Sequence, residues 1–129
     1  MSASARVQRE WDADMAVGIF AGVPVRDYAS ALEWYKRLLG SEPAFHPNDI
    51  EAVWRLAADR YVYIVEDAGR AGGAVCVIWR DDPAAEVERI AARGPRPVDV
   101  EKHGSVWKWI YRDADGNEFG LGGEVAPPG

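Results

Sequence analysis

An internal repeat of predicted elements is the feature that most restricts the folds open to this chain. In each half a strand leads to an aspartate that can cap a helix, and a glycine follows at the helix end. The first helix is predicted between Asp27 and Gly40. The second is predicted between Asp81, which Asp82 follows, and Gly94. The separation is thirteen positions from Asp27 to Gly40 and again from Asp81 to Gly94. Because three more strands are predicted after each helix, the pattern recurs with a period of about 54 residues and indicates a duplication.

Such a repeat predicts an α+β fold built from two tandem βαβββ modules. We expect them to form a curved mixed sheet around a central cleft, with both helices on the outer face. The polar residues before the first strand show no sustained hydrophobic period, and we interpret them as an arm that Trp11 helps to hold. The predicted boundaries are 1–15 for this N-terminal arm, 16–123 for a single domain, about 17–68 and 73–123 for its modules, and 124–129 for a C-terminal tail.

Composition restricts the classes of function. A net charge of -6 argues against a nucleic-acid surface, which needs a basic face to replace counterions along the phosphates. The sequence contains no apolar run near the roughly 18 residues required to span a bilayer. Cys76 is the single cysteine, so no intrachain disulfide can form, and the first residues lack the apolar centre of a secretory signal. We therefore expect a cytoplasmic protein with a small-molecule ligand and neither a nucleic-acid nor a membrane partner.

Two motifs occur within this duplicated order, one early in the chain and one late. The first is the strand-Asp-helix segment VRDYASALEWYKRLLG, and the second is the turn YRDADGNEFGL. Together with the duplication they resemble the vicinal oxygen chelate superfamily, which groups glyoxalases, bleomycin-resistance proteins, extradiol dioxygenases and fosfomycin-resistance enzymes. The resemblance covers Gly18 to Gly122 and implies the two-module fold already expected from the repeat.

The resemblance also implies four positions at which metal-dependent members carry their ligands. In this sequence those positions hold Phe20, Tyr63, Ala74 and Gly120. Divalent zinc, manganese or iron is bound through imidazole, thiolate or carboxylate groups, and none of the four residues supplies one. We therefore predict that the protein binds no metal at this site and uses no cofactor.

Strand alternation predicts which side chains share the cleft, because residues two apart point to the same side of a strand. It places Trp107, Trp109 and Tyr111 toward the helices, where Trp34 and Trp79 would meet them. A single β-bulge would exchange the two sets and turn Trp107 and Trp109 into stacking platforms for a planar ligand. The candidate ligand-binding residues are therefore Phe20, Tyr61, Tyr63, Cys76, Ile78, Lys108 and Gly120, with Trp107 and Trp109 in the exchanged register.

A few titratable residues are candidates for chemistry. His46 and His103 lie at similar places in the two modules, and either could transfer protons near neutral pH, although both are also typical of solvated loops. Cys76 lies in an apolar strand, which raises a thiol pKa and favours packing over nucleophilic attack. Lys108 is the best polar candidate for contacting a ligand.

Three functions remain open from the sequence. The leading hypothesis is a metal-independent protein that sequesters a hydrophobic or planar compound, such as an antibiotic, as the bleomycin-resistance branch does. The alternative is a cofactor-independent isomerase or lyase acting on an oxygenated ring, with a histidine or Tyr63 moving a proton. The third is a small interaction module whose tryptophans mediate assembly. We also predict a homodimer, because the resemblance implies clefts completed between chains.

Overall fold

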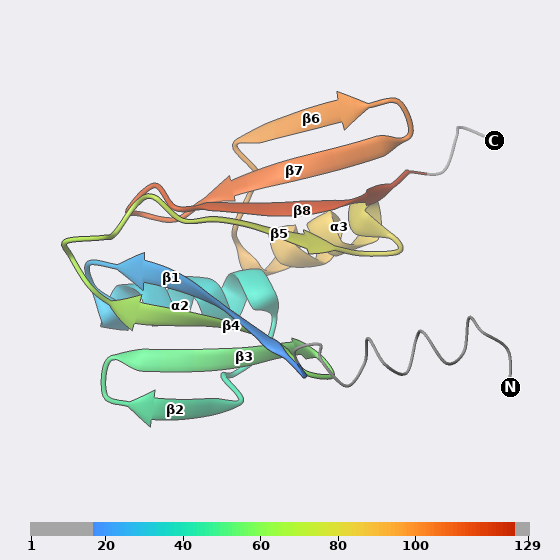
Figure 1. Cartoon of the computed structure of the whole chain (residues 1–129). Helices are drawn as coiled ribbons and strands as arrows, with labels where there is room; N and C mark the ends of the chain where they lie inside the picture. The colour runs from blue at the N-terminus through green and yellow to red at the C-terminus, as the bar shows by residue number, and fades with distance from the viewer. Residues whose placement is uncertain (1–16, 126–129) are drawn as a thin grey trace, which may run out of the picture.

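The structure, a computed structural model, describes residues 17–125 and contains two helices and eight strands in this range (Figure 1). The first half contains β1 (Ile19–Val25), α2 (Tyr28–Leu39), β2 (Phe45–Asn48), β3 (Glu51–Ala57) and β4 (Arg60–Glu66). The second half contains β5 (Val75–Trp79), α3 (Pro83–Arg93), β6 (Asp99–His103), β7 (Val106–Arg112) and β8 (Glu118–Glu124). The N-terminal arm predicted over 1–15, with Trp11, lies outside the described residues.

Each half forms its own four-stranded mixed sheet. The strand orders are β1-β4-β3-β2 and β5-β8-β7-β6, so the two halves have the same topology. The first strand of each half pairs in parallel with the last, and the remaining pairs are antiparallel. The predicted α+β fold of two tandem βαβββ modules is confirmed, with two separately hydrogen-bonded sheets in place of one.

The helix caps follow the sequence in the first module and differ by one residue in the second. Asp27 caps α2 by accepting a hydrogen bond from the Ser30 amide at 3.2 Å. The N-cap of α3 is Asp82, which accepts from the Ala85 amide at 3.2 Å, so Asp81 is not the cap residue. The second helix is therefore one residue shorter, with 11 residues against 12.

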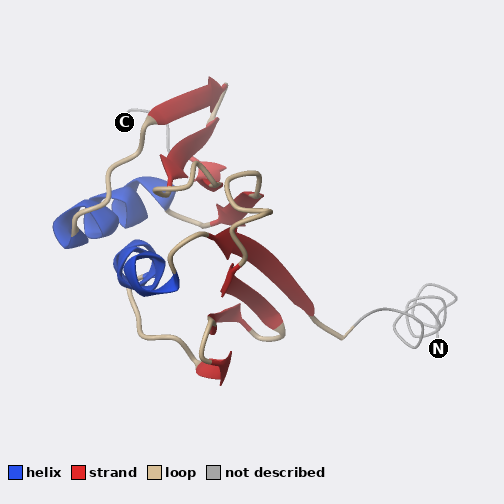
Figure 2. Cartoon of the chain, turned by 90° about the vertical axis from the view of Figure 1, so that its left-hand side faces the viewer, coloured by secondary structure: helices blue, strands red, loops and turns tan. Residues whose placement is uncertain are grey.

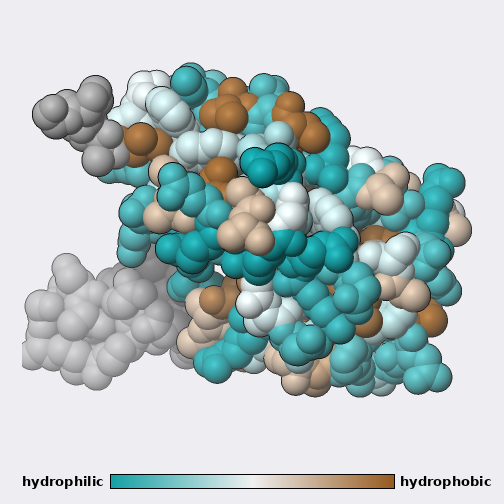
Figure 3. Space-filling model, turned by 180° about the vertical axis from the view of Figure 1, so that it is seen from behind, coloured by the Kyte–Doolittle hydropathy of each residue, from teal (hydrophilic) through white to brown (hydrophobic). Residues whose placement is uncertain are grey.

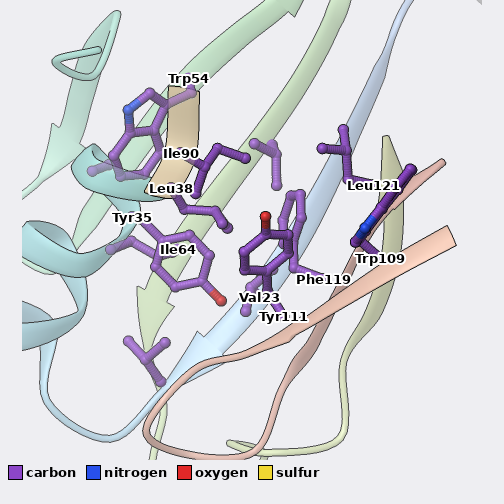
Figure 4. Close-up of a cluster of buried hydrophobic side chains, with 13 residues drawn as sticks. Val23, Tyr35, Leu38, Trp54, Ile64, Ile90, Trp109, Tyr111, Phe119 and Leu121 are labelled. Atoms are coloured by element: carbon purple, nitrogen blue, oxygen red, sulfur yellow. The ribbon is translucent and has the colours of Figure 1, made fainter. Parts of the chain in front are cut away.

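Both helices lie on the same side of the two sheets (Figure 2). One hydrophobic core joins the modules, because side chains of α2 and α3 pack with those of both sheets (Figure 4). Tyr35 of α2 shows this clearly, since its ring contacts Trp54 of the first module and Phe119 of the second. The outer side, seen from behind, is mostly hydrophilic with small separate hydrophobic patches (Figure 3).

The Asp-x-Asp-Gly-Asn turn at 113–117 joins the modules through hydrogen bonds of two buried residues, Asp113 and Asn117. Asn117 Nδ2 donates to the Pro24 carbonyl and to Asp113 Oδ2, both at 2.8 Å. Asn117 Oδ1 accepts from the amides of Gly72 and Ala74, each at 3.0 Å. Tyr35 Oη donates to Asp113 Oδ2 at 2.8 Å, which ties α2 to the same turn. The motif therefore fixes β1, the inter-module segment and α2 relative to β8, and its role is structural.

No helix in the described range is long and apolar enough to cross a membrane. The predicted cytoplasmic location stays a prediction.

Candidate functional site

Each sheet has one side against the helices and one side away from them, which we call the open face. In β1, Val23 and Val25 are buried on the helix side, so Phe20 and Gly22 lie on the open face. In β4, Val62 and Ile64 are buried on the helix side, and the Tyr61 ring contacts Phe20. The sequence prediction for Phe20, Tyr61 and Tyr63 therefore agrees with the side on which the structure places them.

The open face of the first sheet carries an aromatic platform made of Phe20, Phe45 and Tyr61. The Phe20 and Tyr61 rings are stacked with centroids 4.5 Å apart and planes 9° from parallel, and the Phe45 ring meets Tyr61 edge-on at 6.4 Å. Phe20 is 55% exposed and Phe45 is 46% exposed. A planar apolar surface that is open to solvent offers stacking and burial to a flat ligand.

Tyr63 lies beside this platform because β1 has a glycine opposite it. Gly22 and Tyr63 are register partners in the parallel pair of β1 and β4. A Cβ at position 22 would lie 2.6 Å from Cζ and Oη of Tyr63, so the ring crosses the space that a side chain would fill. Gly22 therefore keeps the tyrosine ring flat against the sheet.

The open face of the second sheet has a different chemistry. Lys108 Nζ forms an ion pair with Glu101 Oε2 at 3.4 Å, and His103 Nε2 lies 4.0 Å from the same oxygen. We call these three residues the polar cluster. All three are accessible, since the Lys108 side chain is 28% exposed, Glu101 40% and His103 76%. The predicted ligand contact Lys108 therefore lies on the open face with a carboxylate partner.

Two glycines of β8 form the floor beneath large side chains of this second face. The Lys108 side chain crosses Gly120, where a Cβ would lie 3.2 Å from Lys108 Cδ. The Trp79 ring crosses Gly122, where a Cβ would lie 3.3 Å from ring carbons. The glycine at the position of the family carboxylate therefore makes room for the stem of Lys108.

The predicted orientation of β5 is wrong. Cys76 and Ile78 pack against the core, whereas Val75, Val77 and Trp79 are 68%, 50% and 61% exposed. The physical reason is the helix cap, because the sequence repeat was aligned on Asp81 and the true cap is Asp82. A shift of one residue moves every side chain of a strand to its other side. Burial also raises the pKa of the Cys76 thiol, which opposes a nucleophilic role.

The tryptophans of β7 face the helices, as strand alternation predicted, so the exchanged register does not occur. Trp109 is 8% exposed and belongs to the core, and Trp107 packs beside it with ring centroids 5.6 Å apart. Lys102 Nζ lies 4.2 Å from the Trp107 ring centroid. Trp34 is half-buried against this core, but Trp79 is not part of it. Trp107 and Trp109 therefore offer no stacking surface on the open face.

The two histidines lie in different settings. His103 is in the polar cluster, whereas His46 Nδ1 is 3.1 Å from the hydroxyl of Tyr28 in α2. His46 follows Phe45 in β2 and so points to the helix side when Phe45 points to the open face. The structure does not bring the histidines together.

A cavity of about 310 Å³ lies at the seam between the modules, and we call it the seam cavity. Ile78 and Gly120 line it, whereas Phe20, Tyr61 and Lys108 do not. The predicted cleft residues are thus divided between the open faces, the core and this seam.

The sequence model of the glyoxalase-like domain family matches residues 20–122, which is most of the chain. This protein belongs to the glyoxalase-like domain family. A crystal structure of a glyoxalase/bleomycin resistance protein from Catenulispora Acidiphila matches at 39% identity and a TM-score of 0.82, over 85% of this chain and 100% of that one. No curated protein matches the chain.

Two more distant structures share the fold of this glyoxalase-like domain. A bleomycin-binding protein complexed with bleomycin matches at 20% identity and a TM-score of 0.67, over 85% of this chain and 100% of that one. TnmS3, an antibiotic binding protein from Streptomyces sp. CB03234, matches at 21% identity and a TM-score of 0.67, over 86% and 98%. At these identities the likeness establishes the fold alone.

The donor atoms of this glyoxalase-like domain do not fit the metal site of metal-dependent relatives. After correction of the β5 register, the four positions hold Phe20, Tyr63, Val75 and Gly120. One phenol among two hydrocarbon side chains and a glycine cannot supply a coordination sphere. Within residues 17–125, no group of three or more His, Cys, Asp and Glu side chains is placed to hold a metal ion.

Three open-face residues were not identified from the sequence. Phe45 lies between two prolines, which indicate irregular structure, although it is the first residue of the edge strand β2. Trp79 was placed in the core through the misaligned cap. Glu101 has no distinguishing signal in the sequence, since its pairing with Lys108 depends on the register of β6 with β7, which places the two residues opposite each other.

Proposed function

We propose that this glyoxalase-like domain is a metal-independent protein that sequesters a planar or hydrophobic compound, of the antibiotic-resistance type. The observation that carries the proposal is the exposed stacked pair of Phe20 and Tyr61, widened by Phe45. Sites for small molecules combine apolar and aromatic area with a few polar groups. The bleomycin-binding and antibiotic-binding proteins of the same fold support this reading.

The test is a fluorescence titration with planar antibiotics, bleomycin included, and aromatic metabolites, with and without EDTA. Tyr61 lies in the platform itself, and Trp79, which is 61% exposed, lies on the open face of the second sheet, so the two residues report on binding at different faces. Tyr61→Leu removes half of the stacked pair, and Tyr28→Leu is a matched control on the helix side. We expect chelator-insensitive quenching, recovery of unchanged ligand, and a loss of affinity in Tyr61→Leu but not in Tyr28→Leu. Equal affinity in both variants would contradict the proposal.

A second candidate function, a cofactor-independent isomerase or lyase, rests on the polar cluster. Glu101 lies between Lys108 at 3.4 Å and His103 at 4.0 Å, and such a group can accept and return a proton. Product analysis of each bound compound by mass spectrometry and NMR separates the two functions. Turnover that is lost in Glu101→Gln with binding retained would establish the enzyme and overturn simple sequestration.

We also propose that two chains form a homodimer through the first strands of their sheets. Ile19, Val75, Val77 and Trp79 are each at least half exposed, and exposed apolar surface of this extent is typical of an interface. Light scattering after gel filtration should give twice the mass of one chain at micromolar concentration, and Val75→Asp should give the monomer. A monomer for the unaltered protein would remove this proposal.

A further inference from the structure

Tyr111 carries a buried hydroxyl that has no hydrogen-bond partner among the described residues. Its side chain is 1% exposed, and its Oη is completely shielded from solvent. In Figure 4 this hydroxyl points away from that of Tyr35, which is bound to Asp113. Buried polar groups are nearly always paired, because an unpaired donor loses its hydrogen bonds to water. The Tyr111 hydroxyl therefore has a donor that no described residue uses.

Tyr111 is one of the residues that line the seam cavity. This cavity combines apolar side chains of both modules, including Leu38 and Leu56 of the first and Ile90 and Phe119 of the second, with Tyr111. Its volume of about 310 Å³ lies at the lower end of the range of roughly 300–1,000 Å³ that is usual for small-molecule sites. A mainly apolar cavity of this size, which Arg60, Arg80 and Glu86 also line, suits a small, mainly hydrocarbon ligand with one polar group.

Three charged residues, Arg60, Arg80 and Glu86, also line part of the cavity. Glu86 is already paired with Arg80 at 3.0 Å and Arg89 at 2.7 Å, and Arg93 lies 3.8 Å away. Burial, with a smaller contribution from the charge of Glu86, raises the pKa of Tyr111 to about 12. The hydroxyl is consequently protonated at neutral pH and acts as a donor toward an acceptor oxygen.

We propose that the seam cavity is a second ligand site, separate from the aromatic platform, for a small apolar molecule that carries one carbonyl oxygen. Tyr111 Oη donates a hydrogen bond to that oxygen, and side chains from both modules enclose the hydrocarbon part. Occupancy would bridge the β3–β4 hairpin and α3, so this ligand would also stabilise the arrangement of the modules.

The test compares acetophenone with cumene, in which a methyl group replaces the carbonyl oxygen. Chemical-shift changes in ¹H–¹⁵N spectra should locate both compounds near Ile90 and Phe119. Tyr111→Phe should weaken acetophenone binding by about 2- to 12-fold, the range of one net hydrogen bond, and leave cumene unchanged. Leu56→Trp, at a 40% exposed position of the lining, should block both compounds.

The free protein supplies a readout that needs no ligand. If the Tyr111 hydroxyl has no protein partner, Tyr111→Phe should leave the unfolding midpoint unchanged or raise it by roughly 2 to 6 °C. A lowered midpoint would mean that the hydroxyl is used inside the fold and would overturn the proposal. The proposal would also be overturned if Tyr111→Phe weakened the binding of acetophenone and cumene equally. Chemical-shift changes confined to Phe20 and Tyr61 would overturn it as well. Tyr61→Leu should not affect either compound, which separates this site from the proposed function.

Discussion

The two open faces share a backbone and differ in almost every side chain. The first face offers stacked rings, with Phe20 on Tyr61 at 4.5 Å, whereas the second offers a glycine floor under Lys108 and Trp79 and an ion pair with Glu101. Strand order, parallel pairing and the helix caps are common to both modules. The duplication thus preserved what the core requires and left the open faces free to diverge, one toward apolar area and one toward charge.

The largest effect is expected from loss of the hydrogen bonds that join the two modules at the turn 113–117. Asn117→Ala removes the four hydrogen bonds of a buried side chain and leaves the Pro24 carbonyl and two amides without these partners. We expect the free energy of unfolding to fall by about 3 to 4 kcal/mol, measured by urea denaturation. Asn48→Ala, at the exposed last residue of β2, is the control and should cost less than about 1 kcal/mol. A small effect at Asn117 would mean that the turn does not hold the modules together.

The crowding of the first face can be tested at Gly22. A Cβ there lies 2.6 Å from the Tyr63 ring, so Gly22→Ala should displace the ring and cost about 1 to 3 kcal/mol of unfolding free energy. Gly73→Ala is the matched control, because nothing lies within 4 Å of a Cβ at that position. In a Tyr63→Ala background the penalty at Gly22 should disappear. A penalty that persists there would place the clash elsewhere.

The composition of the second face depends on the orientation of β5, which Cys76 can report. Burial raises the thiol pKa, so less thiolate is present at a given pH and the alkylation profile shifts to higher pH. We expect iodoacetamide to react with Cys76 more slowly at pH 8 than with Ser105→Cys, an exposed turn position, in a Cys76→Ser background. Equal rates would place Cys76 on the open face, as the sequence predicted for β5.

The smallest effect is expected from the ion pair of the second face. Glu101→Gln removes the partner of Lys108, but both side chains are partly exposed and water screens their attraction. The cost in unfolding free energy should not exceed about 1 kcal/mol and should shrink in 1 M salt. A larger, salt-independent cost would assign a structural role to the polar cluster.

The sequence predicted the architecture well, because capping residues and hydrophobic periods act locally. Asp27, Gly40 and Gly94 each terminate a helix where the residue type requires it. The open faces were predicted in part. Strand alternation correctly places Phe20, Tyr61 and Lys108 on the open faces, because no bulge interrupts the alternation in their own strands. Cys76 and Ile78 were misplaced because two adjacent aspartates can each cap a helix, and sequence spacing cannot choose between them. The seam cavity depends on packing between modules, which no local pattern encodes.

The central claim is that the aromatic platform contributes most of the ligand-binding affinity, and affinity measurements on two variants test this claim directly. Tyr61→Leu and Lys108→Met each alter one open face, and each is titrated with every planar antibiotic or aromatic metabolite that the unaltered protein binds in EDTA. We predict that Tyr61→Leu weakens binding by about tenfold, since stacking on an aromatic ring contributes roughly 1 to 3 kcal/mol, and that Lys108→Met weakens it less. The reverse order, or binding that EDTA abolishes, would contradict the account.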